Sequence, residues 1–274
     1  MKKIIAMAAV MLSLAAPALA WDQQPPRPPQ ACQDQAPWGF PQAQRQGTPI
    51  CRKAYATLND QQAKISIWTV YTLTPDHALG CIARTNAFVA DASLPKGQRA
   101  EISDYAKSGY DMGHVAPDGD MSWDTQVEFE SFLMTNMMPQ LPGLNRGIWK
   151  LLETSVRGWA VQTNNTFTVY AGPIYGAGDK TIGANNVVVP RAFYKVVVNN
   201  NTGAYAGWLF PHAGNQGNDL TKLRVPVSTI QQQAGIQFPV PPAGKELQPG
   251  GEWTVDFGSL TKAKKAKCGA NAEG

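Results

Sequence analysis

The chain has 274 residues, of which 43% are hydrophobic and 16% are charged, and its formal net charge is +4. This composition excludes a disordered or fibrous protein, and the length suits one large domain or two small ones. The mild positive charge would suit a polyanionic partner, but it does not identify one by itself.

The N-terminus has the features of a secretory signal. Two lysines precede an apolar run that ends at Leu14, and a small-residue cleavage site at 18–20 comes before Trp21. A membrane anchor is the alternative, but the run is short for a span and Pro17 lies at its end. We therefore predict a signal peptide over 1–20 and an exported protein, periplasmic or extracellular, with no membrane span after cleavage.

Export changes the interpretation of the four cysteines, Cys32, Cys51, Cys81 and Cys268. An even number in an oxidising compartment indicates two disulfides, for which three pairings exist. We favour Cys32–Cys51, which closes a short loop, and this leaves Cys81–Cys268 to hold the C-terminal end. A zinc site is disfavoured because there is no C-x-x-C pair and the spacings are irregular.

The rest of the pattern predicts an α+β fold with a central antiparallel sheet, or sheets, flanked by helices. Residues 21–50 are rich in Pro and Gln and predict an irregular N-terminal arm that cannot fill a core. A globular domain over 51–260 and a basic, solvated tail over 261–274 follow. Alternating, β-rich segments predict strands, and apolar periodicity predicts helices, with Asp124 as the N-cap of the first helix. The strands are expected at 65–71, 166–171, 187–198 and 204–210, and the helices at 125–134 and 145–157. Because strands and helices do not alternate regularly, α+β is favoured over α/β.

Three histidines are present, and His114 is the candidate for chemistry. His77 and His212 fall in turn-rich segments and are predicted to be surface residues. His114 ends an extended segment, and Gly113 beside it permits close backbone approach. An imidazole with an ordinary pKa of about 6.5 can accept a proton near neutral pH.

The predicted helix from 145 carries two different faces. Leu144, Ile148, Leu151 and Leu152 form an apolar stripe for the core. A second set steps by four residues along a neighbouring face and consists of Asn145, Trp149, Glu153 and Arg157. A solvent-exposed polar face would explain Arg157, but it explains Asn145 and Trp149 less well.

These segments together resemble the DNA/RNA non-specific endonuclease family, the ββα-metal (His-Me finger) nucleases, which include secreted sugar-non-specific nucleases and mitochondrial endonuclease G. The similarity spans most of residues 52–260. Its blocks are Ala83-Arg84-Thr85-Asn86, 111–117 around His114, 135–140 beginning Thr135-Asn136, Asn145-Arg146-Gly147-Ile148-Trp149 with Glu153, Ala171-Gly172-Pro173-Ile174-Tyr175, and 189–196.

The resemblance implies a ββα-metal active-site motif and an Mg²⁺-dependent endonuclease, with Mn²⁺ as a substitute. It would cut DNA and RNA with little sequence preference and leave 5′-phosphate ends. It implies that His114 is the general base, that Asn145 is the metal ligand, and that Arg84 and Arg157 contact phosphate. Asn136 is carried over as a substrate-site residue. Met112 stands where the family's Asp-Arg-Gly-His motif has arginine.

Elementary chemistry supports the same roles. Phosphodiester hydrolysis needs a deprotonated water, neutralised phosphoryl charge and a stabilised leaving oxygen. A site with one carboxamide oxygen, from Asn145, suits Mg²⁺, which keeps several of its waters. On a straight helix the Cα of Glu153 would lie about 12 Å from that of Asn145 and be rotated by about 80°. We therefore expect Glu153 to act through a metal-bound water.

Other interpretations remain open at this point. Asn136 and Asp111 are expected to organise the site, and Trp149 is expected to pack, with base stacking as its alternative. A degenerate member that binds nucleic acid without cutting is one alternative function, and a phosphodiesterase acting on small substrates is another. A structural or adhesive domain leaves the block from His114 to Glu153 unexplained.

Overall fold

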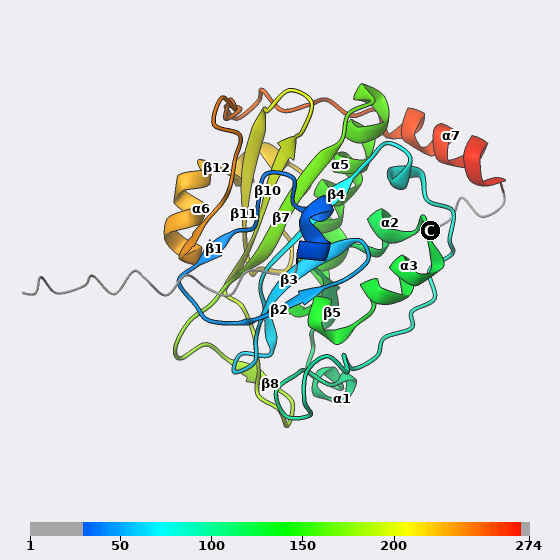
Figure 1. Cartoon of the computed structure of the whole chain (residues 1–274). Coiled ribbons are helices and arrows are strands. Elements are labelled where there is room, and N and C mark those ends of the chain that lie inside the picture. Colours follow the sequence, from blue (N-terminus) through cyan, green and yellow to red (C-terminus); the bar gives the residue numbers. More distant parts are fainter. Residues whose placement is uncertain (1–29, 270–274) are drawn as a thin grey trace, which may run out of the picture.

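A seven-stranded antiparallel sheet forms the centre of the protein (Figure 1). The computed structural model describes residues 30–269, so the predicted signal peptide lies outside the described residues. In spatial order the strands are β12 (Arg224–Val225), β11 (Tyr205–Pro211), β10 (Ala192–Asn199), β7 (Phe167–Ile174), β4 (Ile65–Leu73), β3 (Tyr55–Asp60) and β2 (Thr48–Cys51). The predicted α+β class with a central antiparallel sheet is confirmed.

The predicted strands correspond to β4, β7, β10 and β11, but one of them is divided. The segment 187–198 forms β9 (Val187–Val188), which pairs with β8 (Thr181–Ile182), and then β10. Pro190 lies between the two strands and has no N–H to donate to a ladder, so continuous pairing stops there. Strand β3, which pairs with β4, was not predicted.

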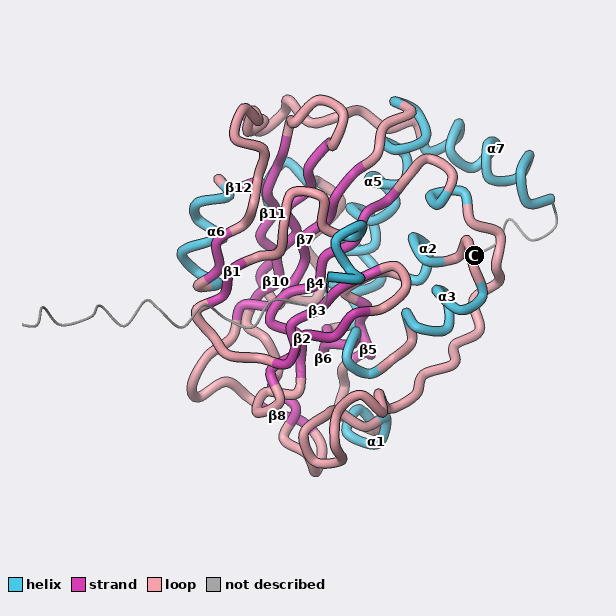
Figure 2. The backbone as a smooth tube through the Cα atoms, in the orientation of Figure 1, coloured by secondary structure: helices cyan, strands magenta, loops and turns pink. Residues whose placement is uncertain are grey.

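Alternating side chains build a core on each face of the sheet. Figure 2 shows helices on both sides of the strands. In β10, Phe193 and Val197 belong to the core that includes Leu152, Val156 and Trp159 of α5 (Lys150–Thr163). Tyr194 and Val196 belong to the opposite core, which α6 (Val227–Ala234) covers. Because successive side chains in a strand point to opposite faces, Lys195 lies on the same side as Phe193, toward α5.

The described part of the predicted N-terminal arm packs as part of the domain. Residues 30–50 contribute η1 (Gln30–Gln35), β1 (Gln42–Ala43), which pairs with β13 (Ile236–Gln237), and the edge strand β2. Cys32, Ala36, Ala43 and Ile50 are buried. The expectation that this segment contributes nothing to the core is therefore wrong, because its few apolar side chains are spaced to reach the sheet between the prolines.

A separate hairpin and helix stand beside the sheet. Strand β5 (Asp111–His114) pairs antiparallel with β6 (Met137–Gln140), and the chain then passes through α4 (Pro142–Leu144) and the π-helical turn η4 (Asn145–Trp149) into α5. Between the two strands lie α2 (Asp118–Met121), α3 (Thr125–Ser131) and η3 (Met134–Asn136). The order β5, β6 and α5 is the expected ββα arrangement.

The two predicted helices are present with different ends. Helix α3 begins after Asp124, whose carboxylate accepts the N–H groups of Gln126 and Val127, so the predicted N-cap is confirmed. The second helix is not straight from residue 145. Gly147 has φ −101° and ψ −116°, which breaks regular helix geometry before α5 begins at Lys150.

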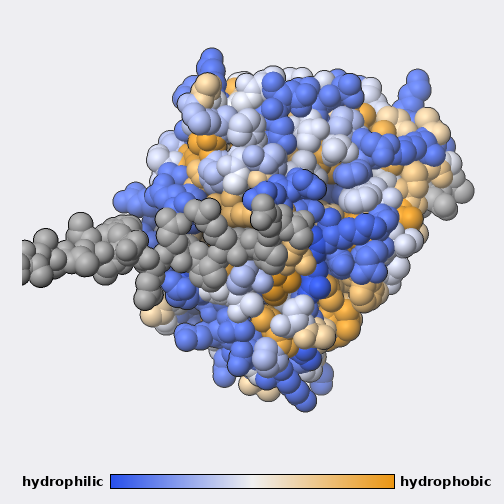
Figure 3. Space-filling view, in the orientation of Figure 1, coloured by the Kyte–Doolittle hydropathy of each residue, from blue (hydrophilic) through white to orange (hydrophobic). Residues whose placement is uncertain are grey.

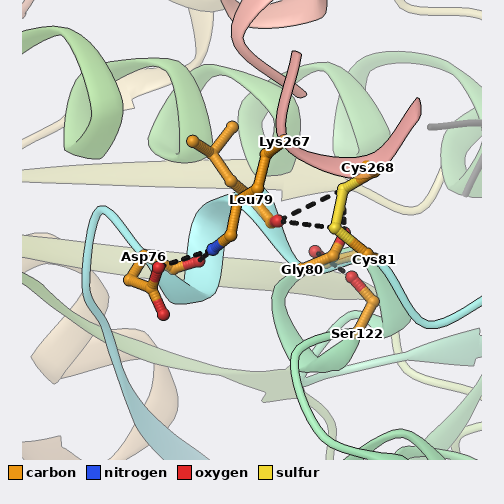
Figure 4. The surroundings of a disulfide bond; sticks show 8 residues. Asp76, Leu79, Gly80, Cys81, Ser122, Lys267 and Cys268 are labelled. Atoms are coloured by element: carbon orange, nitrogen blue, oxygen red, sulfur yellow. Dashed lines mark hydrogen bonds and ion pairs between the residues drawn. A yellow bond between two sulfur atoms is a disulfide. The ribbon is translucent and has the colours of Figure 1, made fainter. Parts of the chain in front are cut away.

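The C-terminal segment forms helix α7 (Phe257–Cys268), which packs on α5 and η2 (His77–Leu79). The predicted tail therefore begins inside this helix. Both predicted disulfides, Cys32–Cys51 and Cys81–Cys268, are confirmed. Lys267, beside the second disulfide, pairs with Asp76 at 2.5 Å, and Figure 4 shows how these residues lie. The remaining short elements are α1 (Ile102–Tyr105) and η5 (Leu220–Leu223).

Polar side chains cover much of the face seen in Figure 3. Within residues 30–269 no helix has the length and apolar character needed to cross a membrane.

Removal of the Cys81–Cys268 disulfide by serine substitutions should lower the free energy of unfolding by up to about 5 kcal/mol. The bond joins residues 187 apart in sequence, and the chain-entropy model predicts a loss that grows with the closed loop. The Cys32–Cys51 bond, with a separation of 19, should give about 3 kcal/mol by the same model. Urea unfolding of both double variants measures the two losses. No change on removing Cys81–Cys268 would contradict the expectation.

Candidate active site

A cleft of about 760 Å³ lies between β5, α2 and the start of α5. Five of the six residues proposed from sequence line it, and its lining includes four cationic side chains, two of which belong to those five. The proposed residues in the cleft are His114, Asn145, Glu153, Arg84 and Arg157, and Met112 also lines it. The cations are Arg84, Arg146, Lys150 and Arg157. The fold therefore brings together residues that lie up to 73 positions apart in the chain.

His114 is held at the end of β5 by packing and backbone contacts. The residue is 9% exposed, and its ring makes an edge contact with Phe132 at 4.9 Å between centroids. The indole of Trp149 donates a hydrogen bond of 3.3 Å to the His114 carbonyl. A Cβ at Gly113 would collide with the carboxamide of Gln140 on β6, so the close approach predicted at this glycine is present. The imidazole is thus fixed at the wall of the cleft.

Burial, with a smaller contribution from Arg84, lowers the pKa of His114 to about 3. Its Nε2 is buried, and among residues 30–269 it has no hydrogen-bond partner. Because desolvation disfavours the charged imidazolium, the ring stays neutral and able to accept a proton in mildly acidic solution.

Protonation of His114 should therefore not limit catalysis in the ordinary titration range of histidine. The neutral fraction of a base with a pKa of about 6.5 would fall about 25-fold between pH 7 and pH 5. Since the pKa of His114 is displaced to about 3, we expect no such loss from this ring. The measurement is kcat/KM from pH 5 to pH 7.5 at saturating metal, with circular dichroism as a check on folding. Because Glu153, with a pKa of about 7, can produce an acid limb of its own, the profile of Glu153→Gln is measured beside that of the wild type. An acid limb near pH 6.5 that is still present in Glu153→Gln would contradict the expectation for His114.

Asn145 lies at the beginning of η4, where a neighbouring carboxylate orients it. Its Nδ2 donates to Asp111 Oδ2 at 2.9 Å, which directs the amide nitrogen toward β5 and leaves the carboxamide oxygen for another partner. Asp111 also accepts hydrogen bonds from Nε and Nη2 of Arg146, at 2.8 and 2.6 Å. Asp111 therefore organises the site, as expected, by fixing two consecutive residues of η4.

Glu153 is 7% exposed and lies next to the buried Lys195. The Lys195 Nζ is 3.3 Å from Glu153 Oε1, 4.0 Å from the centroid of Trp149, and 3.4 Å from the Val115 carbonyl that it donates to. The Oε1 contact is ionic, without hydrogen-bond alignment. Burial raises the pKa of Glu153 to about 7, with Lys195 acting in the opposite direction and Asp120 reinforcing the rise.

Two of the three arginines in the cleft are paired with acids from α2. Arg157 Nη1 donates to Asp120 Oδ1 at 2.6 Å, and only 14% of its side chain is exposed. Arg84 lies 3.2 Å from Asp118 Oδ2, and 39% of its side chain is exposed. Arg84 therefore presents more of its guanidinium to the cleft than Arg157 does.

Two residues have roles inside the structure that differ from a substrate contact. Asn136 is fully buried, and its side chain bonds the backbone N–H and carbonyl of Ala116 and the carbonyl of Ser131. The predicted substrate contact of Asn136 is therefore wrong, because all of its polar atoms hold the turn after His114. Trp149 is 1% exposed and packs edge-on against Phe193 and Phe210, so packing is confirmed over base stacking.

Sequence reasoning missed three charged residues of this region. Lys195 appeared only within a matching block, although a single lysine among the apolar residues of β10 is a signal of a buried charge that needs a partner. Arg146 and Lys150 line the cleft because of the η4 turn. The same turn removes the straight-helix geometry on which the predicted separation of Asn145 and Glu153 depended.

The donor atoms in the cleft fit a hard divalent cation that keeps most of its waters. Asn145 and Glu153 both line this cavity, and their side chains bring a carboxamide and a carboxylate to it. Within the described part of the chain, no group of three or more His, Cys, Asp or Glu side chains is arranged to hold a metal. Oxygen donors in small number suit Mg²⁺ better than a structural zinc site.

Comparison with known proteins gives consistent relatives. A protein-family model described as "DNA/RNA non-specific endonuclease" matches residues 36–242 of the chain. Nuclease C1 of Cunninghamella echinulata var. echinulata is 29% identical over 68% of this chain and 81% of its own length. A nuclease of Nostoc sp. is 36% identical over 69% and 72%, and human mitochondrial endonuclease G is 29% identical over 68% of each. A solved chain from an EndoG/EndoGI complex has a TM-score of 0.68 at 26% identity and covers 77% of this chain and 92% of its own.

The family match covers most of the described sheet, both strands of the hairpin and helix α5. The chain therefore belongs to the DNA/RNA non-specific endonuclease family, a family of nucleases that hydrolyse phosphodiester bonds.

Proposed function

We propose that this protein is an exported, Mg²⁺-dependent endonuclease that cuts DNA and RNA with little sequence preference and leaves 5′-phosphate ends. The observation that carries the proposal is that His114, Asn145 and Glu153 line one cleft whose remaining charged rim includes four cations. Contacts to phosphates carry no sequence information, so a cleft of this kind suits many sequences. The two disulfides suit an oxidising compartment outside the cytoplasm.

His114 acts as the general base, because its neutral ring can remove a proton from the attacking water. Asn145 would hold the cation through its carboxamide oxygen, and Glu153 would accept hydrogen bonds from the waters of the cation. When bound, the Mg²⁺ ion neutralises phosphoryl charge and stabilises the leaving oxygen. Lys195 supplies a positive charge beneath Glu153, which favours the ionised carboxylate.

The cations of the rim hold the polyanionic substrate. Arg84 and Arg146, with 39% and 72% of their side chains exposed, can share their guanidinium groups with phosphate oxygens. Arg157 would contribute mainly through its charge, because its Nη1 already donates to Asp120.

Digestion of a supercoiled plasmid and of a long RNA by the purified mature protein tests this function. We expect cleavage of both polymers with Mg²⁺, loss of cleavage in excess EDTA, and recovery when Mg²⁺ is restored. Binding that weakens with salt, without cleavage in Mg²⁺ or Mn²⁺, would instead indicate a family member that binds without cutting. Turnover of a small diester in preference to either polymer would indicate a phosphodiesterase.

A further inference from the structure

A second groove, of about 680 Å³, continues from the active-site cleft along the other side of α5. Arg146 and Lys150 line both cavities, so they stand at the junction between them. The opposite wall comes from two distant parts of the chain, namely the segment with Asn218 and Leu220 and the start of α7 with Phe257. A nucleic-acid strand that leaves the reaction site past Arg146 and Lys150 would enter this groove.

The composition of the groove suits a flat aromatic ring attached to an anion. Its apolar lining consists of Leu151, Leu220, Val255 and Phe257, and its polar lining includes Thr154, Ser155 and Asn218. Phe257 is 40% exposed and lines the groove, so part of its ring is accessible there. None of the described residues that line the groove is acidic, while two cations stand at its junction with the cleft.

The position of Phe257 is fixed by the contacts of α7. Asp256 caps the helix by accepting the N–H groups of Gly258 and Ser259, and its own backbone bonds the Gln162 side chain of α5 at 2.6 and 3.0 Å. At the far end Cys268 is joined to Cys81 (Figure 4). These attachments hold the start of α7 against α5, so the fold fixes the position of this wall of the groove.

We propose that this groove is a nucleobase subsite, which binds one unpaired base of the strand being cut while its phosphate lies at Arg146 and Lys150. The base stacks on Phe257, because an aromatic face accepts any base and therefore adds affinity without sequence preference. A base can enter only when it is unstacked from its neighbours and unpaired, so the subsite favours single-stranded substrates. Phe257, which supplies the stacking ring, lies outside the matched residues 36–242.

The inference rests on the proposed nuclease function, and substitution of Phe257 tests it separately. Phe257→Ala should raise KM for a single-stranded oligonucleotide about tenfold, the loss expected for one stacked base. Phe257→Tyr, which keeps a stacking ring, should restore the wild-type KM. Turnover of a small chromogenic diester, which occupies only the reaction site, should stay unchanged in both variants.

An oligonucleotide with one cleavable phosphodiester among phosphorothioates locates the base. An abasic residue placed next to the cut, on each side in turn, should raise the wild-type KM on one side only. In Phe257→Ala the same abasic residue should have no further effect, because both changes remove one contact.

Phe129→Ala on α3 is the matched control, since Phe129 is 42% exposed and does not line either cavity. It should leave every KM unchanged. An unchanged KM in Phe257→Ala, or an equal loss on the small diester, would overturn the subsite. A wild-type protein that cuts no polymer would instead overturn the proposed function itself.

Discussion

Replacement of His114 by alanine should lower kcat on plasmid DNA by about 10²–10⁴-fold, the usual contribution of a general base. The neutral imidazole at the wall of the cleft is the group placed to take the proton of the attacking water. KM should change little, because the ring provides no charge for phosphate. Initial rates across a range of DNA concentrations at fixed Mg²⁺ measure both constants.

His77→Ala is the matched control for this substitution. The His77 ring stacks on Trp123 at 3.9 Å between centroids and does not line the cleft, so its removal should leave kcat unchanged. Thermal unfolding of both variants separates a lost base from a lost fold. Full activity in folded His114→Ala would remove the basis of the catalytic assignment.

Replacement of Asn145 by alanine should raise the Mg²⁺ concentration for half-maximal activity by at least about tenfold to a hundredfold. Loss of a group that only supports a metal ligand already costs this much, and Asn145 is proposed as the ligand itself. The substitution also removes the hydrogen bond to Asp111, so the ordering of η4 would weaken. Mg²⁺ titration of the cleavage rate gives the midpoint directly.

Asn165→Ala makes the same chemical change beyond the end of α5, outside the cleft, and should leave the Mg²⁺ midpoint unchanged. If Asn145→Ala kept the wild-type midpoint, the cation would have to be held by other groups. Glu153→Gln then becomes informative, because it keeps the size of the side chain while removing its negative charge.

Local sequence determined much of this protein. The segments around His114 and from Asn145 to Glu153 contain their signals within a few residues, so their family and their chemistry could be predicted without coordinates. The strands β4, β7 and β11 and the cap at Asp124 also follow from short patterns. The even number of cysteines and the expected export indicated two disulfides. The short loop between Cys32 and Cys51 then favoured the pairing that the structure has.

Tertiary structure alone decided how these pieces meet. Lys195 reaches the Val115 carbonyl from 80 residues away, and Trp149 reaches the His114 carbonyl from 35 residues away. Asn136 looked available to substrate, yet the fold uses all of its polar atoms inside the turn after β5. Such contacts depend on the relative placement of separate elements.

The same distinction explains the active-site helix and the second groove. Residue periodicity predicted a straight helix from Asn145, whereas the break at Gly147 redirects Arg146 and Lys150 to the junction of two cavities. Phe257 carries no signal of its own in the sequence. It lines the groove because the disulfide and the packing on α5 hold its helix there, and residue patterns do not encode the packing of distant surfaces.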